Sequence, residues 1–217
     1  MSHEIRTPLN AIIGFSDMIC QTGEEEEKQE YMKIVSSNNE LLLQLIDDIL
    51  DLSKIEAGTM EFTLAPTDIN DLMEGIYRQM QEKNTSPDVA ITFMEKAEEC
   101  ILNTDRVRLS QVIINFTNNA MKFTPKGSIQ IGYRIDEAKD EIYFYVKDTG
   151  IGIPADKINE VFERFVKLNT FAKGTGLGLA ICRVIVERLG GTIGADSKEG
   201  EGSCFWFRLP ITPKSNN

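Results

Sequence analysis

The chain contains one histidine, His3, which lies in the segment Ser2-His3-Glu4-Ile5-Arg6-Thr7-Pro8. Neutral imidazole is a nucleophile at cellular pH, because the unperturbed pKa of histidine lies near neutrality. An acid, Glu4, follows His3 directly, and a hydroxyl group, that of Thr7, comes one helical turn later. These residues indicate a candidate reactive histidine. The alternative is an ordinary frayed N-terminus or the remnant of a purification tag.

A second candidate group lies in residues 115–123. Asn115, Asn119 and Lys122 are spaced by four and three residues, so they share one face of a helix. An amide oxygen is a hard ligand suited to a Mg²⁺ ion that is also held by waters and phosphates, and a lysine ammonium suits phosphate. The three residues together predict a metal and phosphate site, although a single asparagine in a helix is usually polar surface.

Two glycine-rich segments complete the candidate chemistry. In residues 148–154 a predicted strand ends just before Asp148, and Gly150 and Gly152 permit a tight turn and close approach of a ligand. A buried carboxylate here can accept a hydrogen bond from an exocyclic amine such as that of adenine. The second segment, residues 174–179, leads into a helix whose first N–H groups favour an anion. Its glycine spacing is neither the dinucleotide fingerprint nor a P-loop. Each segment alone also fits an ordinary turn.

The first sixty residues are expected to form two helices that meet near Gly23. Apolar residues recur at helical spacing in residues 5–19 and again, three and four apart, in residues 35–52. Two helices with one apolar stripe each cannot bury those stripes alone, and pairing two hairpins gives a four-helix bundle. This predicts a homodimer. The alternative is that the hairpin packs on the C-terminal part of its own chain.

After Gly58 the pattern becomes mixed α/β. Pro66-Thr67-Asp68 is expected to be the start of a helix that continues to about residue 81, and further helices are expected over residues 105–121 and 176–189. Strands are expected near residues 60–64, 89–94, 100–103, 128–135, 141–146, 192–197 and 203–209. Residues 200–203 form a turn between the last two strands. The segment from 148 to 174 is expected to be rich in loops with short helical pieces.

Composition excludes several classes of function. The formal net charge of −11 argues against a nucleic-acid partner, because phosphate backbones require a basic face. No apolar run is long enough to cross a bilayer, and the polar start is unlike a signal peptide, so a soluble protein is expected. The four cysteines lack CxxC spacing, and only one histidine exists to help bind zinc, which favours structural thiols in a reducing compartment.

Taken together and in this order, these segments closely resemble the catalytic core of bacterial sensor histidine kinases. Residues 2–9 resemble the H box of that family, residues 115–123 its N box, and residues 148–154 its first glycine box. Phe162-Glu163-Arg164-Phe165 resembles the F box, residues 174–179 the second glycine box, and residues 200–203 the short terminal glycine motif. Asp105, Arg108, Leu109 and Gln111 match the usual lead-in to the N box. The resemblance covers nearly the whole chain.

The resemblance implies an α+β fold with two domains. Residues 1–57 would be the dimerisation and histidine-phosphotransfer domain, a two-helix hairpin that forms a dimeric four-helix bundle. Residues 58–65 would be a linker that permits hinge motion, and residues 66–212 an ATP-binding α/β sandwich of the gyrase/chaperone/histidine-kinase superfamily. Residues 213–217 would be a tail.

It also implies roles for individual residues. His3 would attack the γ-phosphate of ATP, and Glu4 would accept or orient the imidazole proton. Asn119, with Asn115, would hold Mg²⁺, Lys122 would contact phosphate, and Asp148 would bind the adenine amino group. The remaining expected nucleotide-site residues are Gly150, Gly152, Phe162, Phe165, Lys167, Gly174, Thr175, Gly176, Leu177, Gly178 and Ser203. Residues 156–173 would form a lid, and Lys167 stands where many relatives carry arginine.

The implied function is ATP-dependent autophosphorylation of His3 followed by transfer to an aspartate of a response-regulator receiver domain. Glu4 to Thr7 fits an arrangement associated with dephosphorylation of the regulator, with Thr7 positioning water; alternatively, Thr7 only packs or caps before Pro8. This would be a cytoplasmic portion without a membrane segment, and its parent chain can be anchored in the cytoplasmic membrane. The alternatives are a non-catalytic ATP-binding signalling scaffold and a chaperone- or gyrase-like ATPase.

Overall fold

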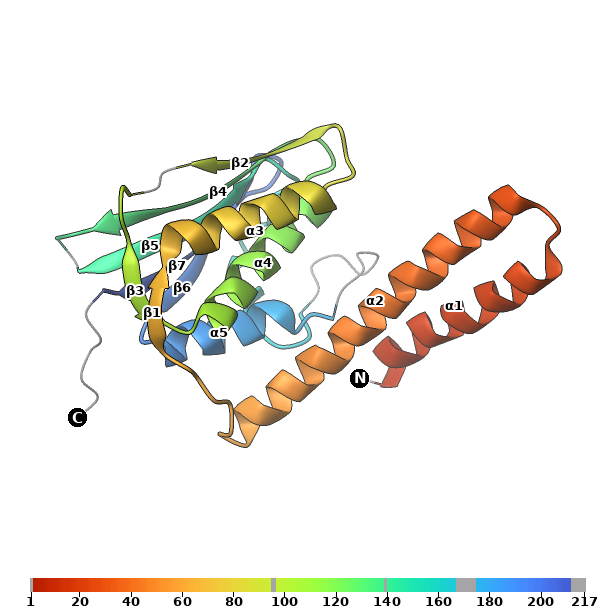
Figure 1. Cartoon of the computed structure of the whole chain (residues 1–217), viewed down its shortest axis with the longest axis horizontal. Coiled ribbons are helices and arrows are strands. Elements are labelled where there is room, and N and C mark those ends of the chain that lie inside the picture. Colours follow the sequence, from red (N-terminus) through yellow and green to blue (C-terminus); the bar gives the residue numbers. More distant parts are fainter. Residues whose placement is uncertain (1, 95–96, 139, 167–174, 212–217) are drawn as a thin grey trace. The chain divides into compact units, whose positions relative to one another are not determined.

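The structure is a computed structural model that describes residues 2–94, 97–138, 140–166 and 175–211, without the side chains of residues 2 and 3. The chain divides into two compact units, Met1–Met60 with Asn169–Leu177, and Glu61–Leu168 with Gly178–Asn217. The first unit is built on two helices, and the second combines helices with strands (Figure 1). The expected α+β class, with an N-terminal helical hairpin, is therefore confirmed. Among the described helices, none has the length and apolar character that a membrane span requires.

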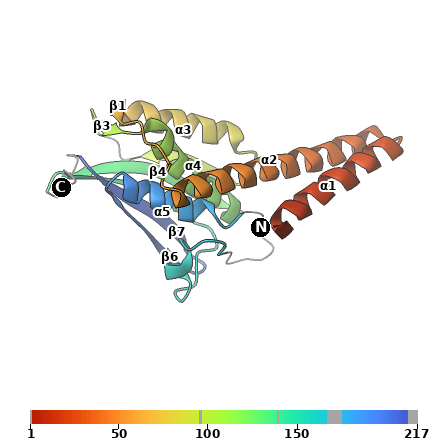
Figure 2. The ribbon, with the colours of Figure 1, turned by 90° about the horizontal axis from the view of Figure 1, so that it is seen from below.

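The first unit is a hairpin of α1 (Ser2–Gln21) and α2 (Glu25–Glu56), which lie side by side in both ribbon views (Figures 1 and 2). The Thr22 hydroxyl donates to the Glu27 carboxylate at 2.6 Å and accepts from the Glu24 N–H at 3.2 Å, which fixes the turn. Acidic residues occupy the first turn of α2, where negative charge is favourable next to the helix dipole. Phe15 and Tyr31 pack across the hairpin with ring centroids 5.6 Å apart.

The second unit is an α/β sandwich. Its main sheet has the order β2 (Val89–Met94), β4 (Gly127–Asp136), β5 (Glu141–Asp148), β7 (Gly202–Pro210) and β6 (Thr192–Lys198). Strands β2 and β4 are parallel, and the other neighbours are antiparallel. A second, two-stranded sheet pairs β1 (Ala65–Asp68) with β3 (Ile101–Thr104). The loop after β5 contains the short 3-10 helix η1 (Ile158–Glu160).

Helices α3 (Ile69–Lys83), α4 (Arg106–Phe123) and α5 (Gly178–Arg188) cover one face of the main sheet (Figure 1). Side chains alternate between the two faces of a strand, so every second residue of β4, β5 and β7 points toward these helices. Tyr133, Phe144 and Phe207 are fully buried there, and the rings of Phe144 and Phe207 stack with centroids 4.7 Å apart. Phe116 of α4 packs against Phe205 and Phe207 from the helical side. The core of the second unit thus joins α4 to the centre of the sheet.

The strand expected over residues 60–64 is wrong. No strand covers those residues, and the paired strand is β1, at Ala65–Asp68, where the sequence suggested the start of a helix. The apolar alternation at Met60, Phe62 and Leu64 has no partner strand, because β3 pairs only with β1. The Thr63 N–H instead donates to the Asp105 carboxylate at 2.8 Å. The expectation that Asp68 opens the next helix is confirmed, because its side chain accepts from the Asp71 N–H.

The other face of the main sheet carries aromatic side chains that lie over glycines. Gly132 pairs with Tyr145, and Gly194 pairs with Trp206, in the register of the sheet. A Cβ added at Gly194 would overlap the indole of Trp206, so the ring occupies the space above this glycine. The Trp206 indole N–H donates to Asp196 at 2.8 Å. Glycine at position 194 is therefore required by the packing of the neighbouring strand.

We predict that Gly194→Ala lowers the free energy of unfolding by about 1–3 kcal/mol, because the indole must move and cannot do so without losing its contacts. Gly75→Ala is the matched control. Gly75 lies inside α3 with open space around its Cβ position, so alanine there should stabilise the protein by about 0.5–1 kcal/mol. Urea unfolding followed by tryptophan fluorescence and circular dichroism measures both. Equal effects of the two substitutions would contradict the packing argument.

Candidate nucleotide-binding and phosphoacceptor sites

The expected metal and phosphate residues lie along α4. Its N-terminus is capped by Asp105, whose carboxylate accepts from the N–H groups of Val107 and Arg108 at 3.0 Å each. Asn115 and Asn119 lie one turn apart further along the helix. The side-chain amide nitrogen of Asn119 donates to the amide oxygen of Asn115 at 3.1 Å. This hydrogen bond uses the amide nitrogen of Asn119, so the amide oxygen of Asn119 remains the atom of that side chain suited to a cation.

Lys122 lies in the last turn of α4, and its ammonium group is 4.7 Å from the centroid of the Phe123 ring. A cation over an aromatic face is stabilised by the ring quadrupole. The three polar residues of the expected N box, Asn115, Asn119 and Lys122, are therefore on one helix and within about two turns of one another.

The second glycine segment reaches the same helix through Gly178, the first residue of α5. A Cβ added at Gly178 would overlap the side-chain amide of Asn115. Glycine at position 178 lets the start of α5 approach Asn115 without displacing its side-chain amide. The N-terminus of α5, which favours anions, is thereby brought beside the asparagine pair of α4.

Asp148 is the last residue of β5 and is buried, with 5% of its surface exposed. One carboxylate oxygen accepts from the N–H groups of Gly150 at 2.8 Å and Ser203 at 3.3 Å. Burial raises the pKa of Asp148 above its ordinary value, and the two backbone N–H groups oppose that shift because they stabilise the ionised form. The arrangement holds the Asp148 carboxylate at a fixed place through one of its two oxygens.

The loop after Asp148 is tied to the end of α4. The Ile151 N–H donates to the Phe123 carbonyl at 3.1 Å. A Cβ added at Gly150 would overlap that same carbonyl and would come within 2.9 Å of the Asp148 carboxylate. The first glycine segment and the N box, separated by some 25 residues in the sequence, are thus joined by this close backbone approach.

The terminal glycine motif supports the same loop from the other side. Gly202 has a φ of 107°, and a Cβ there would overlap the Asp148 carbonyl, so the strand that carries Ser203 can lie close to Asp148. The Gly200 N–H donates to the Ile151 carbonyl at 2.8 Å, and the Ser197 hydroxyl accepts from the Ile153 N–H at 2.8 Å. Sequence reasoning missed Ser197, because an isolated serine in a strand carries no recognisable pattern.

The two phenylalanines of the expected F box lie in different environments. The Phe162 ring packs edge-on against Phe205 of β7, with centroids 6.2 Å apart. Phe165 is 49% exposed and adopts a left-handed backbone with a φ of 63°, which is unfavourable for a bulky residue. Arg183 of α5 forms an ion pair with Glu163 at 3.4 Å. The F box is therefore attached to the sheet and to α5 through its first half.

Lys167 and Gly174 lie outside the described residues. Gly176 has a φ of 72°, and the Thr175 hydroxyl accepts from the Leu177 N–H at 3.0 Å. Within the first unit, the same hydroxyl donates to the Asp48 carboxylate at 2.7 Å, and burial raises the pKa of Asp48. Asp48 was not singled out from the sequence, because it is one acid among several in a long helix.

The expected phosphoacceptor segment lies at the start of α1. The backbone of His3 is helical, and Glu4 and Thr7 follow it in the same helix, Glu4 half-buried and Thr7 exposed. Residues four apart share a helix face, so Thr7 lies on the face of His3. The candidate nucleophile and the Asp148 and N-box residues therefore belong to different units of the chain.

Two models of protein families match the chain. The model described as histidine kinase-, DNA gyrase B- and HSP90-like ATPase matches residues 104–213, and that described as His Kinase A (phospho-acceptor) domain matches residues 1–58. The chain is 36% identical over 225 residues to the autoinducer 2 sensor kinase/phosphatase LuxQ of Vibrio vulnificus (strain YJ016). That alignment covers 97% of this chain and 26% of LuxQ, so the chain spans about a quarter of that relative.

Solved structures of similar fold include full-length ShkA in complex with AMPPNP, with a TM-score of 0.75 and 30% identity over 99% of this chain and 45% of that chain. Histidine kinase ThkA in complex with response regulator protein TrrA has a TM-score of 0.77 and 26% identity over 99% of this chain and 61% of that chain. The phosphoacceptor model covers the segment that resembles the H box, and the ATPase model covers the segments that resemble the N and glycine boxes. The chain therefore belongs to the sensor histidine kinases.

Proposed function

We propose that this chain is an ATP-dependent protein-histidine kinase that phosphorylates its own His3 and passes the phosphoryl group to an aspartate of a response-regulator receiver domain. The observation that carries the proposal is the convergence of Asp148, the Asn115–Asn119 pair and the start of α5 in one unit. The only histidine of the chain lies on a separate helical hairpin. Residues 1–57 would then be the phosphotransfer domain, residues 58–65 the linker, residues 66–212 the catalytic domain and residues 213–217 a tail.

The site residues fit ATP with Mg²⁺. The buried Asp148 carboxylate keeps one oxygen on Gly150 and Ser203, and the other can accept from the adenine amino group. Asn119 and Asn115 supply hard amide oxygens for Mg²⁺, and Lys122 supplies positive charge for phosphate. Gly150, Gly152 and Gly178 let the glycine segments pack closely on Phe123, Lys198 and Asn115, which holds these segments beside the N box. Bound Mg²⁺ would neutralise charge on the phosphates.

The chemical step is an in-line phosphoryl transfer. The imidazole nitrogen of His3 forms a bond to the γ-phosphorus as the bond to the leaving oxygen of ADP breaks, and Glu4 accepts or orients the proton on the other ring nitrogen. Protein groups contribute mainly positioning and charge stabilisation in such transfers. A second candidate function is a signalling scaffold that binds ATP without transferring its phosphoryl group. Such a scaffold would use the same nucleotide-site residues but would leave His3 unmodified.

The hairpin supports dimerisation. Apolar side chains of both helices are about half exposed, among them Ile13, Met32, Leu43, Ile46 and Leu50. The free energy gained by burying such side chains favours a partner of matching shape, and a second hairpin would complete a four-helix bundle. We therefore propose a homodimer, in a cytoplasmic portion of a longer protein that can be membrane-anchored. The negative net charge remains unsuited to nucleic acid.

Regulator phosphatase activity is a further part of the proposal. LuxQ is named a kinase/phosphatase, and ThkA is seen with a response regulator. Thr7 is exposed and lies on the helix face of His3, so its hydroxyl would orient water toward a phosphoaspartate. The alternative, that Thr7 only packs or caps, predicts no effect on this activity.

Incubation with γ-labelled ATP tests the kinase directly. The wild type should acquire label that is labile to acid and stable to base, as a phosphohistidine is, and His3→Gln should acquire none while binding nucleotide as the wild type does. Label on His3→Gln would contradict His3 as the acceptor. Nucleotide binding without any label on the wild type would favour the scaffold, and steady hydrolysis without phosphoprotein would favour a chaperone- or gyrase-like ATPase.

Thr7→Ala should reduce dephosphorylation of the phosphorylated regulator about tenfold or more, because an oriented hydroxyl positions the attacking water. Autophosphorylation should be retained. Thr7→Ser keeps the hydroxyl and serves as the control, with phosphatase activity close to the wild type. The role of Thr7 is excluded if Thr7→Ala retains both activities in full.

Asp148→Asn should weaken nucleotide binding roughly 10- to 100-fold, because an amide nitrogen in place of the second oxygen opposes the adenine amino group. The unliganded variant should be as stable as the wild type or more so at pH 7. The folded-state pKa of Asp148 is raised, so ionisation costs folding free energy, and wild-type stability should fall relative to the variant as pH rises through that pKa. Calorimetric titration measures the nucleotide affinity, and melting curves across pH measure the stability. If Asp148→Asn bound nucleotide with unchanged affinity, Asp148 would not be the residue that binds the adenine amino group.

A further inference from the structure

Asp105 uses both carboxylate oxygens for different tasks. It is buried, with 7% of its surface exposed, between the end of β3 and the start of α4. One oxygen accepts from the N–H groups of Val107 and Arg108 and so caps α4. The other accepts from the Thr63 N–H at 2.8 Å, although Thr63 lies 42 residues earlier in the chain. Helix capping alone explains only the first oxygen.

The chain before Thr63 is anchored to α2 in a similar way. The Gly58 N–H donates to the Ile55 carbonyl at 3.1 Å and the Thr59 N–H to the Lys54 carbonyl at 2.9 Å, which together form a Schellman motif. Gly58 has the left-handed φ of 67° that this motif requires. Thr59 is therefore the last residue fixed to the hairpin by this motif. Met60 is buried, with 6% of its surface exposed, and is the last residue of the first unit before the division, so only residues 61 and 62 lie between it and Thr63.

We propose that Asp105 is a positioning residue that fixes the exit of the linker to the helix carrying Asn115, Asn119 and Lys122, so that movement between the two units is confined to residues 61–62. The catalytic part of this inference rests on the proposed kinase function. If the Thr63 bond is lost, the free segment extends to Leu64, because β1 begins at Ala65. Two more free residues add up to about 7 Å of reach. A longer and looser tether lowers the fraction of encounters in which His3 meets the γ-phosphate in line.

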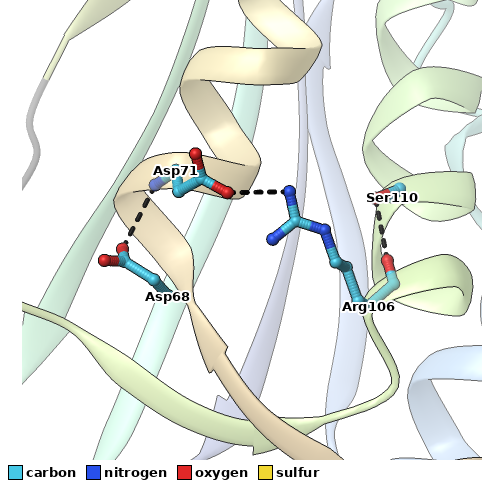
Figure 3. A network of polar contacts seen from close by, with 4 residues as sticks. All are labelled: Asp68, Asp71, Arg106 and Ser110. Atoms are coloured by element: carbon cyan, nitrogen blue, oxygen red, sulfur yellow. Dashed lines mark hydrogen bonds and ion pairs between the residues drawn. The ribbon is translucent and has the colours of Figure 1, made fainter.

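A neighbouring contact offers a matched control. Figure 3 shows Arg106, the first residue of α4, paired with Asp71 of α3 at 2.9 Å, while Asp68 caps α3 through the Asp71 N–H at 3.1 Å. The Arg106–Asp71 pair is exposed, so it contributes little to stability. Asp68 and Asp105 are thus both aspartate helix caps at adjacent helix starts, and Asp105 is the one whose other oxygen holds the linker.

The test compares Asp105→Asn with Asp68→Asn. Asparagine is as good a helix cap as aspartate, but its amide nitrogen would face the Thr63 N–H, and two donors cannot bond. In Asp105→Asn we expect the Thr63 amide to exchange with solvent at least about tenfold faster, while the Val107 and Arg108 amides stay protected. The autophosphorylation rate at saturating ATP should fall about threefold or more, with nucleotide affinity within about twofold of the wild type. Asp68→Asn should leave the Thr63 exchange rate and the autophosphorylation rate unchanged.

Thr63→Pro provides an independent variant, because it removes the donor and leaves the α4 cap intact. It should lower the same rate, and adding Asp105→Asn to it should lower the rate no further. The proposal is overturned if Thr63 exchange is unchanged in Asp105→Asn, if rate and nucleotide affinity fall together, or if Asp68→Asn slows the reaction equally. An inactive wild type would overturn the proposed function alone, and the exchange measurement would still decide whether Asp105 holds the linker.

Discussion

The buried carboxylate of Asp148 is the constraint on which the nucleotide-site geometry depends. A charge with so little exposure must be held by donors, and these are the backbone N–H groups of Gly150 and Ser203. The Gly150 donor is available because the loop turns back at once, and the Ser203 donor because β7 pairs with β5 at that position. Satisfying one side chain therefore links the end of β5, the following loop and the start of β7.

The loop that holds the Asp148 carboxylate is also fixed to α4. The Phe123 carbonyl, at the last residue of that helix, accepts from the Ile151 N–H and occupies the space that a side chain at position 150 would need. The helix that carries the asparagine pair is thereby fixed against the loop that carries the carboxylate. Phe116 secures the middle of the helix on Phe205 and Phe207 of β7, so the metal and phosphate residues rest on the packed core of the sheet.

Each motif could be recognised from the sequence, but the connections between motifs could not. Spacing alone predicted that Asn115, Asn119 and Lys122 share a helix face, and the 3.1 Å bond between the asparagines agrees with it. Asp105 was visible only as part of the lead-in to the N box, because its bond to the Thr63 N–H joins residues far apart in the chain. The alternation at residues 60–64 misled the strand assignment, since a strand exists only where another strand is available to pair with it.

The sequence by itself determined the helical hairpin, the α/β character of the rest and the family, because helical periodicity, glycine turns and short motifs are local properties of the chain. Only the tertiary structure decided which atoms meet. The close approach of Gly178 to Asn115, the sharing of one Asp148 oxygen by the N–H groups of Gly150 and Ser203, and the anchoring of Thr63 by Asp105 depend on distances across the sheet and between helix ends. Such distances follow from how the core packs as a whole, and a linear pattern of residue types does not contain them.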